Sequence, residues 1–360
     1  MKTVFFCGGG TLGPVTPLLA LAEVWQKKSE TKIVFVGTPN GPEREVVEKA
    51  GFVFLSLPKA KIPRYLSNEW LTFPWNFLKA FFAAIKIIFK NKKGKGLIVS
   101  AGGYTAVPMI FAGRLLSVRS WIHQQDVVPL LSNKVTAPIA SLITVAWEDS
   151  LKDFPSQKTK LVGNPIRQEF LLAKKETAQK YFSLNTGKPT VLILGGGTGS
   201  AWLNEGLAKI GNYLVEIANV IHVTGKNKTI EELKDFGSDY HSFELLNEDM
   251  PLAFAAADLV ICRAGMGTIT ELAATHKPAI VIPLPNSPQE DNAAILEDSQ
   301  ASIVIKQSET DAAKLLFIIR YLLADESRRH GLGEILPYLL KTNVAEEMVA
   351  MGEGVLGGKA

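Results

Sequence analysis

One short pattern occurs twice in this chain of 360 residues, and it limits the possible folds more than any other feature. Residues 3–11 read TVFFCGGGT, and residues 190–198 read TVLILGGGT. An unbroken apolar run is typical of a parallel strand buried on both faces, and glycines allow the tight turn that follows. Helices are predicted after each copy, over 17–27 and 201–214. Because strand, glycine turn and helix open a nucleotide-binding unit, the repeat predicts two similar α/β domains in tandem.

Other short apolar runs predict further strands. In the first half they lie at 32–36, 96–100, 120–123, 142–145 and 159–162, and in the second half at 220–223, 259–262, 279–282 and 302–305. Helical patterns separate most of them, so both sheets should be mostly parallel.

The boundary between the domains is predicted at residues 163–167, because Pro165 disfavours helix at Asn164. We therefore expect an N-terminal domain over 1–163 and a C-terminal domain over 164–336. Residues 325–351 are predicted to be helical, and the segment 337–360 can pack back on the first domain.

Composition is that of a globular protein, with 47% hydrophobic and 21% charged residues. The two cysteines, Cys7 and Cys262, lie in apolar runs, which predicts buried free thiols in a reducing compartment. A net charge of +4 is too small to argue for nucleic acid. The first apolar run is too short for a signal peptide, and no unbroken apolar run reaches the roughly 20 residues of a membrane span. We therefore expect a cytoplasmic protein.

The second glycine loop, 195–200, is a candidate phosphate site. The helix after it offers free N–H groups and a partial positive charge, and Thr198 and Ser200 add hydroxyl donors. No Lys-Ser/Thr pair follows the glycines, so the loop is not a Walker A motif. A tight turn without a ligand is the alternative.

Two more polar clusters follow strands of the second half. Arg263-Ala264-Gly265 precedes a helix whose first turn is predicted to hold Glu271, a carboxylate that could accept hydrogen bonds from ribose hydroxyls. Thr268 to Glu271 is also the pattern of a capping box, which is the structural alternative. Gln289 and Asn292 can both donate and accept, as selection among sugar hydroxyls requires, or they can simply belong to a polar loop that caps a helix.

Taken in this order, the clusters resemble the MurG family of glycosyltransferase family 28, which transfers N-acetylglucosamine from its UDP carrier to lipid I at the inner membrane face. The resemblance extends over nearly the whole chain. Its other motifs are Gly9-Gly10-Thr11-Leu12-Gly13, Gly102-Gly103-Tyr104, His123-Gln124-Gln125-Asp126, Gly163-Asn164-Pro165, Gly196-Gly197-Thr198-Gly199 and Asp249-Met250.

The resemblance implies a GT-B fold, in which two Rossmann-like domains face a cleft, and an inverting transfer without metal or cofactor. It implies that the second domain binds UDP-N-acetylglucosamine. The diphosphate would lie at the glycine loop, the ribose at Glu271, the uracil at the backbone of the loop around Leu246 and Asn247, and the sugar beside Gln289 and Asn292. The implied donor-binding residues are Arg167, Gly197, Thr198, Gly199, Leu246, Asn247, Arg263, Gly265, Glu271, Gln289 and Asn292.

A lipid-linked acceptor would bind the first domain. The residues implied for it are Gly10, Thr11, Gly13, Gly103 and Tyr104. Here the chain departs from the family pattern. Pro14 stands where the family has a histidine, and Leu12, Gln124 and Asp126 replace its glycine, glutamate and asparagine.

The departures leave the catalytic base open. Proline cannot accept a proton, and an inverting transfer needs a base near the attacking hydroxyl, or a phosphate that serves as one. Asp126 is the first candidate and His123 the second. A hydrogen-bonded histidine at a strand end is the structural alternative for His123.

Residues 59–95 contain nine Lys or Arg and one acid, interleaved with aromatic and aliphatic residues. The run looks too short and too charged to span a bilayer, but a basic aromatic helix can lie at an anionic membrane surface. A core helix with a solvated basic end is the alternative. With the resemblance, this segment implies a peripheral protein on the cytoplasmic side of the inner (plasma) membrane, and no nucleic-acid partner.

Two other functions stay open at this point. One is a related enzyme on the same fold with another acceptor, such as a glycolipid synthase, or a sugar-nucleotide epimerase. The other is a UDP-sugar-binding protein that has lost turnover, which Pro14 favours.

Overall fold

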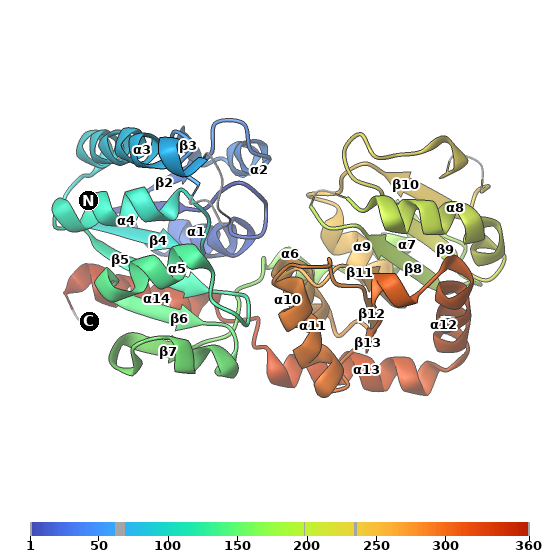
Figure 1. Cartoon of the computed structure of the whole chain (residues 1–360). Coiled ribbons are helices and arrows are strands. Elements are labelled where there is room, and N and C mark those ends of the chain that lie inside the picture. Colours follow the sequence, from blue (N-terminus) through green and yellow to red (C-terminus); the bar gives the residue numbers. More distant parts are fainter. Residues whose placement is uncertain (1, 62–68, 198, 234–235, 359–360) are drawn as a thin grey trace. The chain divides into compact units, whose positions relative to one another are not determined.

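The structure, a computed structural model, describes residues 2–61, 69–197, 199–233 and 236–358. The chain divides into two compact units, residues 1–167 together with 343–360, and residues 168–342. Each unit contains one sheet in which every strand pair is parallel (Figure 1). The prediction of two α/β domains with parallel sheets is therefore confirmed.

The N-terminal domain has a seven-stranded sheet in the order β3-β2-β1-β4-β5-β6-β7. Its strands are β1 (Lys2–Cys7), β2 (Thr31–Gly37), β3 (Val53–Ser56), β4 (Gly96–Ser100), β5 (Arg119–Gln124), β6 (Leu142–Val145) and β7 (Thr159–Leu161). Its α-helices are α1 (Thr16–Lys28), α2 (Glu43–Lys49), α3 (Glu69–Asn91), α4 (Ala106–Leu115), α5 (Leu131–Thr136) and α14 (Ala345–Gly357).

Alternate residues of these strands enter two separate cores. Phe6 and its neighbours pack with Trp25 of α1 and Met348 of α14 on one face. Phe5 and its neighbours pack with Ile88 of α3 and Met109 of α4 on the other. The C-terminal helix α14 therefore completes the N-terminal domain.

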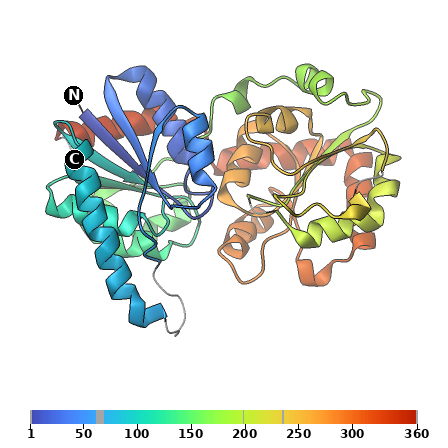
Figure 2. The same cartoon turned by 90° about the horizontal axis from the view of Figure 1, so that it is seen from above.

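Helix α3 packs on this domain along a narrow stripe. Ala80, Ala84 and Ile88 are fully buried and lie at helical spacing, whereas much of the remaining surface of the helix is exposed. Figure 2 shows α3, in light blue, along one side of the domain, with its amino-terminal end extending past the other elements. Its length and hydropathy over 70–91 suffice for a membrane span, with 17% of the most apolar window buried. We expected the apolar run within residues 59–95 to be too short to span a bilayer. That expectation was wrong on length, because the helix continues through Pro74.

The C-terminal domain has a six-stranded sheet in the order β10-β9-β8-β11-β12-β13. Its strands are β8 (Thr190–Leu194), β9 (Asn219–Val223), β10 (Tyr240–Phe243), β11 (Leu259–Cys262), β12 (Ala279–Val281) and β13 (Ile303–Val304). Its α-helices are α6 (Glu169–Leu172), α7 (Lys175–Tyr181), α8 (Ala201–Val215), α9 (Met250–Ala256), α10 (Met266–Thr275), α11 (Gln289–Asp298), α12 (Ala312–Ala324) and α13 (Glu326–Leu339).

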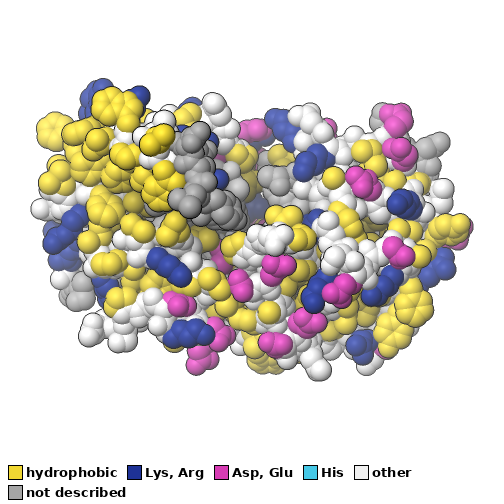
Figure 3. Space-filling view, in the orientation of Figure 1, with side chains coloured by type: hydrophobic (Ala, Val, Ile, Leu, Met, Phe, Trp, Pro, Cys, Tyr) yellow, Lys and Arg dark blue, Asp and Glu magenta, His cyan; other side chains and the backbone are white. Residues whose placement is uncertain are grey.

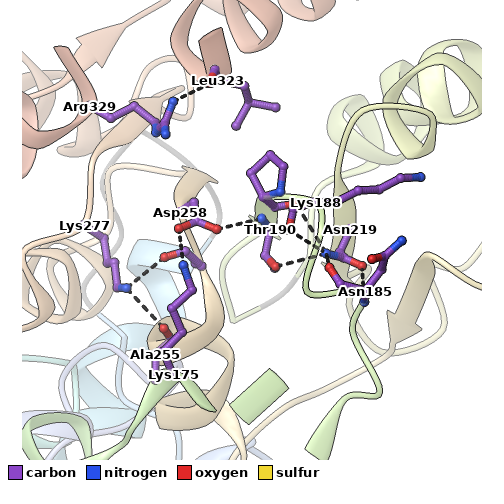
Figure 4. Close-up of polar contacts among 12 residues, drawn as sticks. Lys175, Asn185, Lys188, Thr190, Asn219, Ala255, Asp258, Lys277, Leu323 and Arg329 are labelled. Atoms are coloured by element: carbon purple, nitrogen blue, oxygen red, sulfur yellow. Dashed lines mark hydrogen bonds and ion pairs between the residues drawn. The ribbon is translucent and has the colours of Figure 1, made fainter. Parts of the chain in front are cut away.

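A polar network ties together the amino-terminal ends of these strands (Figure 4). Asp258, just before β11, accepts hydrogen bonds from Lys175 and from the Thr190 backbone N–H. Lys277 donates to the Ala255 and Ala257 carbonyls, and burial lowers its pKa to about 8. This network fixes the edge of the sheet opposite the glycine loop.

Candidate active site

The strand order of the C-terminal sheet reverses between β8 and β11. The chain leaves β8 toward β9 and β10 on one side, and runs from β11 to β12 and β13 on the other. Ligands of open α/β sheets bind outside the carboxyl ends of the strands at such a point. The loops after β8 and β11 are therefore the place to look for a site.

The loop after β8 can be built only with glycine at key positions. Gly196 and Gly199 have φ of +81° and +71°, and a Cβ on Gly199 would collide with the Thr224 carbonyl oxygen. Gly197 is exposed, and Thr198 lies outside the described residues. Ser200 then caps α8, because its Oγ accepts the Leu203 N–H at 3.3 Å. An exposed glycine turn thus leads directly into the N-terminus of a 15-residue helix, an arrangement suited to a phosphate.

Arg263 lies behind this loop and is only 7% exposed. One terminal nitrogen donates to the Ile282 and Pro283 carbonyls at 3.2 and 3.3 Å. The other donates to Ser200 Oγ at 2.6 Å and to Gln307 Oε1 at 3.0 Å. Arg263 therefore connects the loop after β8 to the segments that follow β12 and β13.

The acceptors around Arg263 in these bonds are all neutral, and none of the ion pairs within the described part of the chain includes it. Burial lowers its pKa, but a guanidinium stays charged in proteins. A buried cation without an anionic partner gives the loop a positive potential. The loop would therefore favour an anionic ligand.

Helix α10 starts earlier than the sequence pattern predicts. It begins at Met266 with Gly265 at the N-cap, and no side chain caps it. The capping box from Thr268 to Glu271 was therefore wrong, since Thr268 already lies within the first turn. Glu271 lies in the second turn and is partly exposed, and its charge adds to the burial that raises the pKa of the Cys262 thiol. Its carboxylate is thus close to the carboxyl end of β11.

Side chains of α11 connect the loops after β11 and β12. Gln289 Oε1 accepts the Leu284 N–H at 3.0 Å, and a Cβ on Gly265 would lie 3.9 Å from Gln289 Nε2. Asn292 is fully buried, and its amide donates to the Ala264 carbonyl at 3.1 Å. In this geometry Gln289 is partly exposed, whereas Asn292 supports the loop from within.

Leu246 and Asn247 follow β10 at the same edge of the sheet. Leu246 is buried, and Asn247 is partly exposed. Sequence reasoning missed two neighbours of the glycine loop, Gln307 and Lys228, whose Nζ donates to the Gly199 carbonyl at 3.2 Å. Neither belongs to a motif, so no sequence signal could have found them.

The N-terminal sheet has its own reversal point, between β1 and β4. The loops after these strands are in tight contact there. A Cβ on Gly103 would lie 2.9 Å from the Gly9 carbonyl oxygen, and one on Gly10 would lie 3.1 Å from the Tyr104 ring. Gly10 and Gly103 also have φ of +97° and +90°. The structure therefore brings together the predicted acceptor residues of both loops, Gly10, Thr11, Gly13, Gly103 and Tyr104.

His123 is wholly buried within this domain. Its Nδ1 is 3.0 Å from Thr144 Oγ1, and its Nε2 is 2.8 Å from Asn164 Oδ1. An amide oxygen only accepts, so we assign the proton to Nε2. Burial lowers the pKa of His123 to about 4, against the upward effect of its hydrogen bonds. The ring is neutral near pH 7, with both nitrogens engaged.

The hydrogen-bonded chain continues from His123 to the glycine loop. Asn164 Nδ2 donates to Gln125 Oε1 at 3.4 Å. Gln125 Nε2 in turn lies 3.3 Å from both the Gly13 and the Ala101 carbonyl oxygens. The motif residues His123, Gln125 and Asn164 thus support the loops after β1 and β4 from beneath.

Asp126 lies just after β5, at the same edge of the sheet, and is partly exposed. Gln124 fixes its backbone, donating to the Asp126 carbonyl at 2.7 Å. Asp126 therefore presents a carboxylate nearer the surface than the enclosed His123. Arg167, the last residue of the first segment of this unit, is also partly exposed.

Comparison with known proteins identifies the family of both domains. The N-terminal domain model of glycosyltransferase family 28 matches residues 4–145, and the C-terminal domain model of the same family matches residues 190–330. Both glycine loops lie within the matched regions.

Two curated relatives carry the name UDP-N-acetylglucosamine–N-acetylmuramyl-(pentapeptide) pyrophosphoryl-undecaprenol N-acetylglucosamine transferase. The one from Clostridium botulinum (strain Langeland) is 36% identical over 326 residues, which are 89% of this chain and 91% of the relative. The one from Clostridium perfringens (strain SM101) is 36% identical over 89% of both chains.

Solved structures agree with this similarity. MurG of Acinetobacter baumannii matches with a TM-score of 0.73 at 25% identity, over 98% of this chain and 99% of that one. UDP-N-acetylglucosamine 2-epimerase of Neisseria meningitidis matches with a TM-score of 0.68 at 13% identity, over 98% and 99% of the two chains, and shares the fold alone. Because both domain models match and the relatives span most of the sequence, this protein belongs to glycosyltransferase family 28.

Proposed function

We propose that this protein transfers N-acetylglucosamine from UDP-N-acetylglucosamine to N-acetylmuramyl-pentapeptide pyrophosphoryl-undecaprenol, a step of peptidoglycan synthesis. Curated relatives over 89% of the chain are named for this reaction. A hydroxyl of the muramyl sugar would attack the anomeric carbon with inversion, and UDP would leave with the electron pair of the broken bond.

The observation that carries the proposal is the glycine loop at the N-terminus of α8, with Arg263 buried behind it. The backbone N–H of Gly197 and the N-terminus of α8 would bind the diphosphate, whereas the Gly199 N–H donates to the Gly196 carbonyl at 2.9 Å and so shapes the turn. The helix N-terminus and the guanidinium would stabilise the charge that develops on departing UDP. Since both terminal nitrogens of Arg263 donate within the protein, it would act through the loop and through its charge.

The other donor contacts follow from the loops at the same edge. Glu271 would accept hydrogen bonds from the ribose hydroxyls, and the backbone at Leu246 and Asn247 would meet the uracil. Gln289 would bind the sugar. The buried Asn292 would hold the Ala264 carbonyl, and with it the turn that leads to Gly265.

On the acceptor side we retain Asp126 as the candidate base. It is partly exposed and lies at the carboxyl end of β5, beside the loop that contains Tyr104. His123 is enclosed and bonded at both ring nitrogens, so we assign it a supporting role beneath Gly13.

The acceptor is a lipid, and α3 offers a surface for a membrane. Figure 3 shows hydrophobic side chains gathered over α3 and α4 of the N-terminal domain. Among them Leu71, Trp75 and Phe82 are 83%, 63% and 63% exposed. Lys79, Lys86 and Lys90 lie on the same helix, and Arg64 of the basic segment lies outside the described residues. We infer peripheral binding of an anionic membrane through this face, on the cytoplasmic side.

The test is a transfer assay with the purified full chain, UDP-N-acetylglucosamine and a lipid-linked muramyl-pentapeptide acceptor. We expect product from the wild type, and a UDP Kd raised about tenfold or more in Glu271→Ala because two ribose contacts are lost. Glu297→Gln, an exposed change on α11, is the control and should leave the Kd unchanged. Unchanged UDP affinity in Glu271→Ala would contradict the assignment of the donor site. UDP binding without any transfer would contradict the proposed activity and favour a binding protein.

A further inference from the structure

Residues 225–228 form a tight turn after β9 that lies against the glycine loop of the C-terminal domain. Gly225 and Asn227 have φ of +97° and +58°, a region that glycine and asparagine adopt more readily than other residues. The turn closes through the Lys228 N–H, which donates to the Gly225 carbonyl at 3.1 Å. A Cβ on Gly199 would lie 2.7 Å from the Gly225 Cα, so the two loops are in backbone contact. A side chain at the end of this turn therefore lies beside the candidate diphosphate site.

A buried asparagine on α8 holds both ends of the turn. Asn204 is 1% exposed, and its amide donates to the Thr224 carbonyl at 3.2 Å and to the Lys228 carbonyl at 2.8 Å. Its Oδ1 is buried and has no hydrogen-bond partner among the described residues. A buried acceptor without a partner is costly, so packing alone would favour an apolar side chain at this position. The two bonds to the turn account for the asparagine, which fixes the turn to the amino-terminal half of α8.

The turn places Lys228 across the glycine loop. Its Nζ donates to the Gly199 carbonyl at 3.2 Å, and its Cδ would lie 3.1 Å from a Cβ on Gly199. The missing side chain of Gly199 therefore leaves room for the stem of the lysine as well as for the turn. The ammonium lies at the loop that we assign to the diphosphate.

This ammonium keeps donors for a ligand. None of the ion pairs within the described residues includes Lys228. An ammonium has three protons, and its one acceptor among the described residues is the neutral Gly199 carbonyl. The carboxylate of Glu244 reaches the same turn but accepts the Asn227 N–H, at 3.3 Å. Lys228 therefore supplies a positive charge and two further N–H groups beside the loop.

The glycine turn thus has a cation at each end. The Gly199 N–H closes the turn on the Gly196 carbonyl at 2.9 Å, and a Cβ on Gly196 would lie 3.9 Å from the stem of Arg263. Arg263 is buried and uses both terminal nitrogens within the protein, whereas Lys228 is exposed. One cation therefore acts through its field, and the other can touch a ligand. Such a pair suits a ligand with more than one negative charge.

We propose that Lys228 binds the diphosphate of the sugar nucleotide directly, and that Asn204 positions it by fixing the turn. The inference rests on the proposed function, which supplies the ligand, and it adds two residues that lie outside the motifs of the sequence. The ammonium would join the Gly197 N–H and the N-terminus of α8 as a ligand of the same diphosphate.

The test compares the binding of UDP and of uridine by the purified full chain, with calorimetry for UDP and NMR titration for uridine. Lys228→Gln should raise the Kd of UDP about fivefold to tenfold, because a charged hydrogen bond to the diphosphate is lost, and leave the Kd of uridine within about twofold. Lys228→Arg keeps the charge and should stay within about threefold of the wild type. Lys209→Gln, an exposed change on α8 with the same loss of charge, is the control and should change neither Kd.

Two further measurements separate the contact from its support. Added KCl should weaken UDP binding less in Lys228→Gln than in the wild type, because salt screens the charge pair that the variant lacks. Asn204→Ala should raise the Kd of UDP and leave that of uridine unchanged. In the Lys228→Gln background it should raise the Kd of UDP by less than about twofold, because the contact that it positions is already absent.

The outcomes separate the inference from the proposed function. Equal UDP affinity in Lys228→Gln and Lys209→Gln, or an equal loss of affinity for UDP and for uridine, would overturn the contact and leave the function standing. Additive effects of Asn204→Ala and Lys228→Gln would overturn the positioning role of Asn204. A wild type that binds UDP without transferring the sugar would contradict the activity, and the Kd values would still decide the contact. A wild type that binds no UDP would contradict both.

Discussion

At the scale of single residues, both candidate sites depend on buried polar side chains that hold a glycine loop from beneath. Arg263 does so in the C-terminal domain, through Ser200. Gln125 and Glu43 do so in the N-terminal domain, through Gly13 and Gly10. The exposed loop residues are backbone donors, and backbone donors are only as well placed as the side chains that support them.

Motifs predicted the loops themselves, because a glycine turn between an apolar strand and a helix is local. The supports were harder to predict. Lys228 and Glu43 reach their loops, and Gln307 reaches Arg263, from distant parts of the sequence, so their roles depend on tertiary contacts that leave no local pattern. The enclosure of Asn292 could not be predicted for the same reason, whereas a hydrogen-bonded His123 was one of the two alternatives that the sequence left open.

Replacement of Arg263 tests the support of the donor loop. Arg263→Met keeps most of the apolar stem but removes the charge and the four hydrogen bonds described above. Charged hydrogen bonds contribute about 1.5–3 kcal/mol each, so we expect UDP affinity to fall at least about tenfold, as measured by calorimetry. Arg320→Met, exposed on α12, is the control. Equal UDP affinity in both variants would mean that the guanidinium does not support the site.

The buried His123 predicts a pH dependence of stability. Its pKa is lowered from 6.5 to about 4, so the folded state disfavours the protonated ring. Stability is therefore complete above pH 6.5 and falls as the pH drops toward 4, by up to about 3 kcal/mol. The free energy of unfolding, measured with urea at several pH values across this range, should change less steeply with pH in His123→Gln than in the wild type. His330→Gln, an exposed change on α13, is the control and should keep the pH dependence of the wild type.

At the scale of elements, strands buried on both faces were predictable from the sequence, and short, partly buried strands were not. The apolar runs of β1, β4, β6, β8 and β11 mark strands covered on both faces. The strands missed were β3 and β10, which are four residues long, only partly buried and contain polar residues. Their place in the sheet comes from pairing with β2 and β9, not from their own composition. The predicted helical tail is likewise two helices, α13 and α14, with a break between them.

Helix α14 packs closely enough to make a sharp test. A Cβ on Gly352 would lie 2.5 Å from the Trp25 ring, whereas one on Gly357 would meet nothing within 4 Å. We expect Gly352→Ala to destabilise the N-terminal domain by about 1–3 kcal/mol through overpacking. Gly357→Ala on the same helix is the matched control and should change stability by less than about 0.5 kcal/mol, as measured by thermal unfolding.

The exposed face of α3 predicts membrane binding. A variant with Trp75→Ser and Phe82→Ser should bind vesicles containing anionic lipid at least about tenfold more weakly, because burial of a large apolar side chain contributes about 1.5–3 kcal/mol. The control carries Phe317→Ser and Tyr338→Ser, which are equally exposed but lie in the C-terminal domain. Sedimentation with vesicles measures both. Equal loss in the two variants would show that the α3 face has no special role.

At the scale of the whole molecule, the proposed function divides the two substrates between two domains of similar design. The reversal points of both sheets lie beside glycine loops, which the repeated sequence pattern predicted. The buried side chains beneath the two loops differ, a cation in the C-terminal domain and an acid in the N-terminal domain, so we expect the loops to bind different ligands.

This division predicts where ligands protect the chain. Addition of UDP should slow hydrogen exchange over 195–203, 244–248 and 263–272, and leave 8–15 and 101–105 unchanged. At about 100 times its Kd, UDP should stabilise the unit to which it binds by about 2.7 kcal/mol. Mass spectrometry of exchanged peptides measures this, and protection confined to the N-terminal loops would contradict the assignment of the donor.

The position of α14 has a consequence for how the protein is made. The N-terminal domain takes its last helix from residues 343–360, whereas residues 168–342 form the other unit without interruption. On the ribosome, the domain whose synthesis starts first must therefore wait for α14 before Trp25 is covered. The unit encoded second can finish folding first, and the N-terminal domain is then the last to mature.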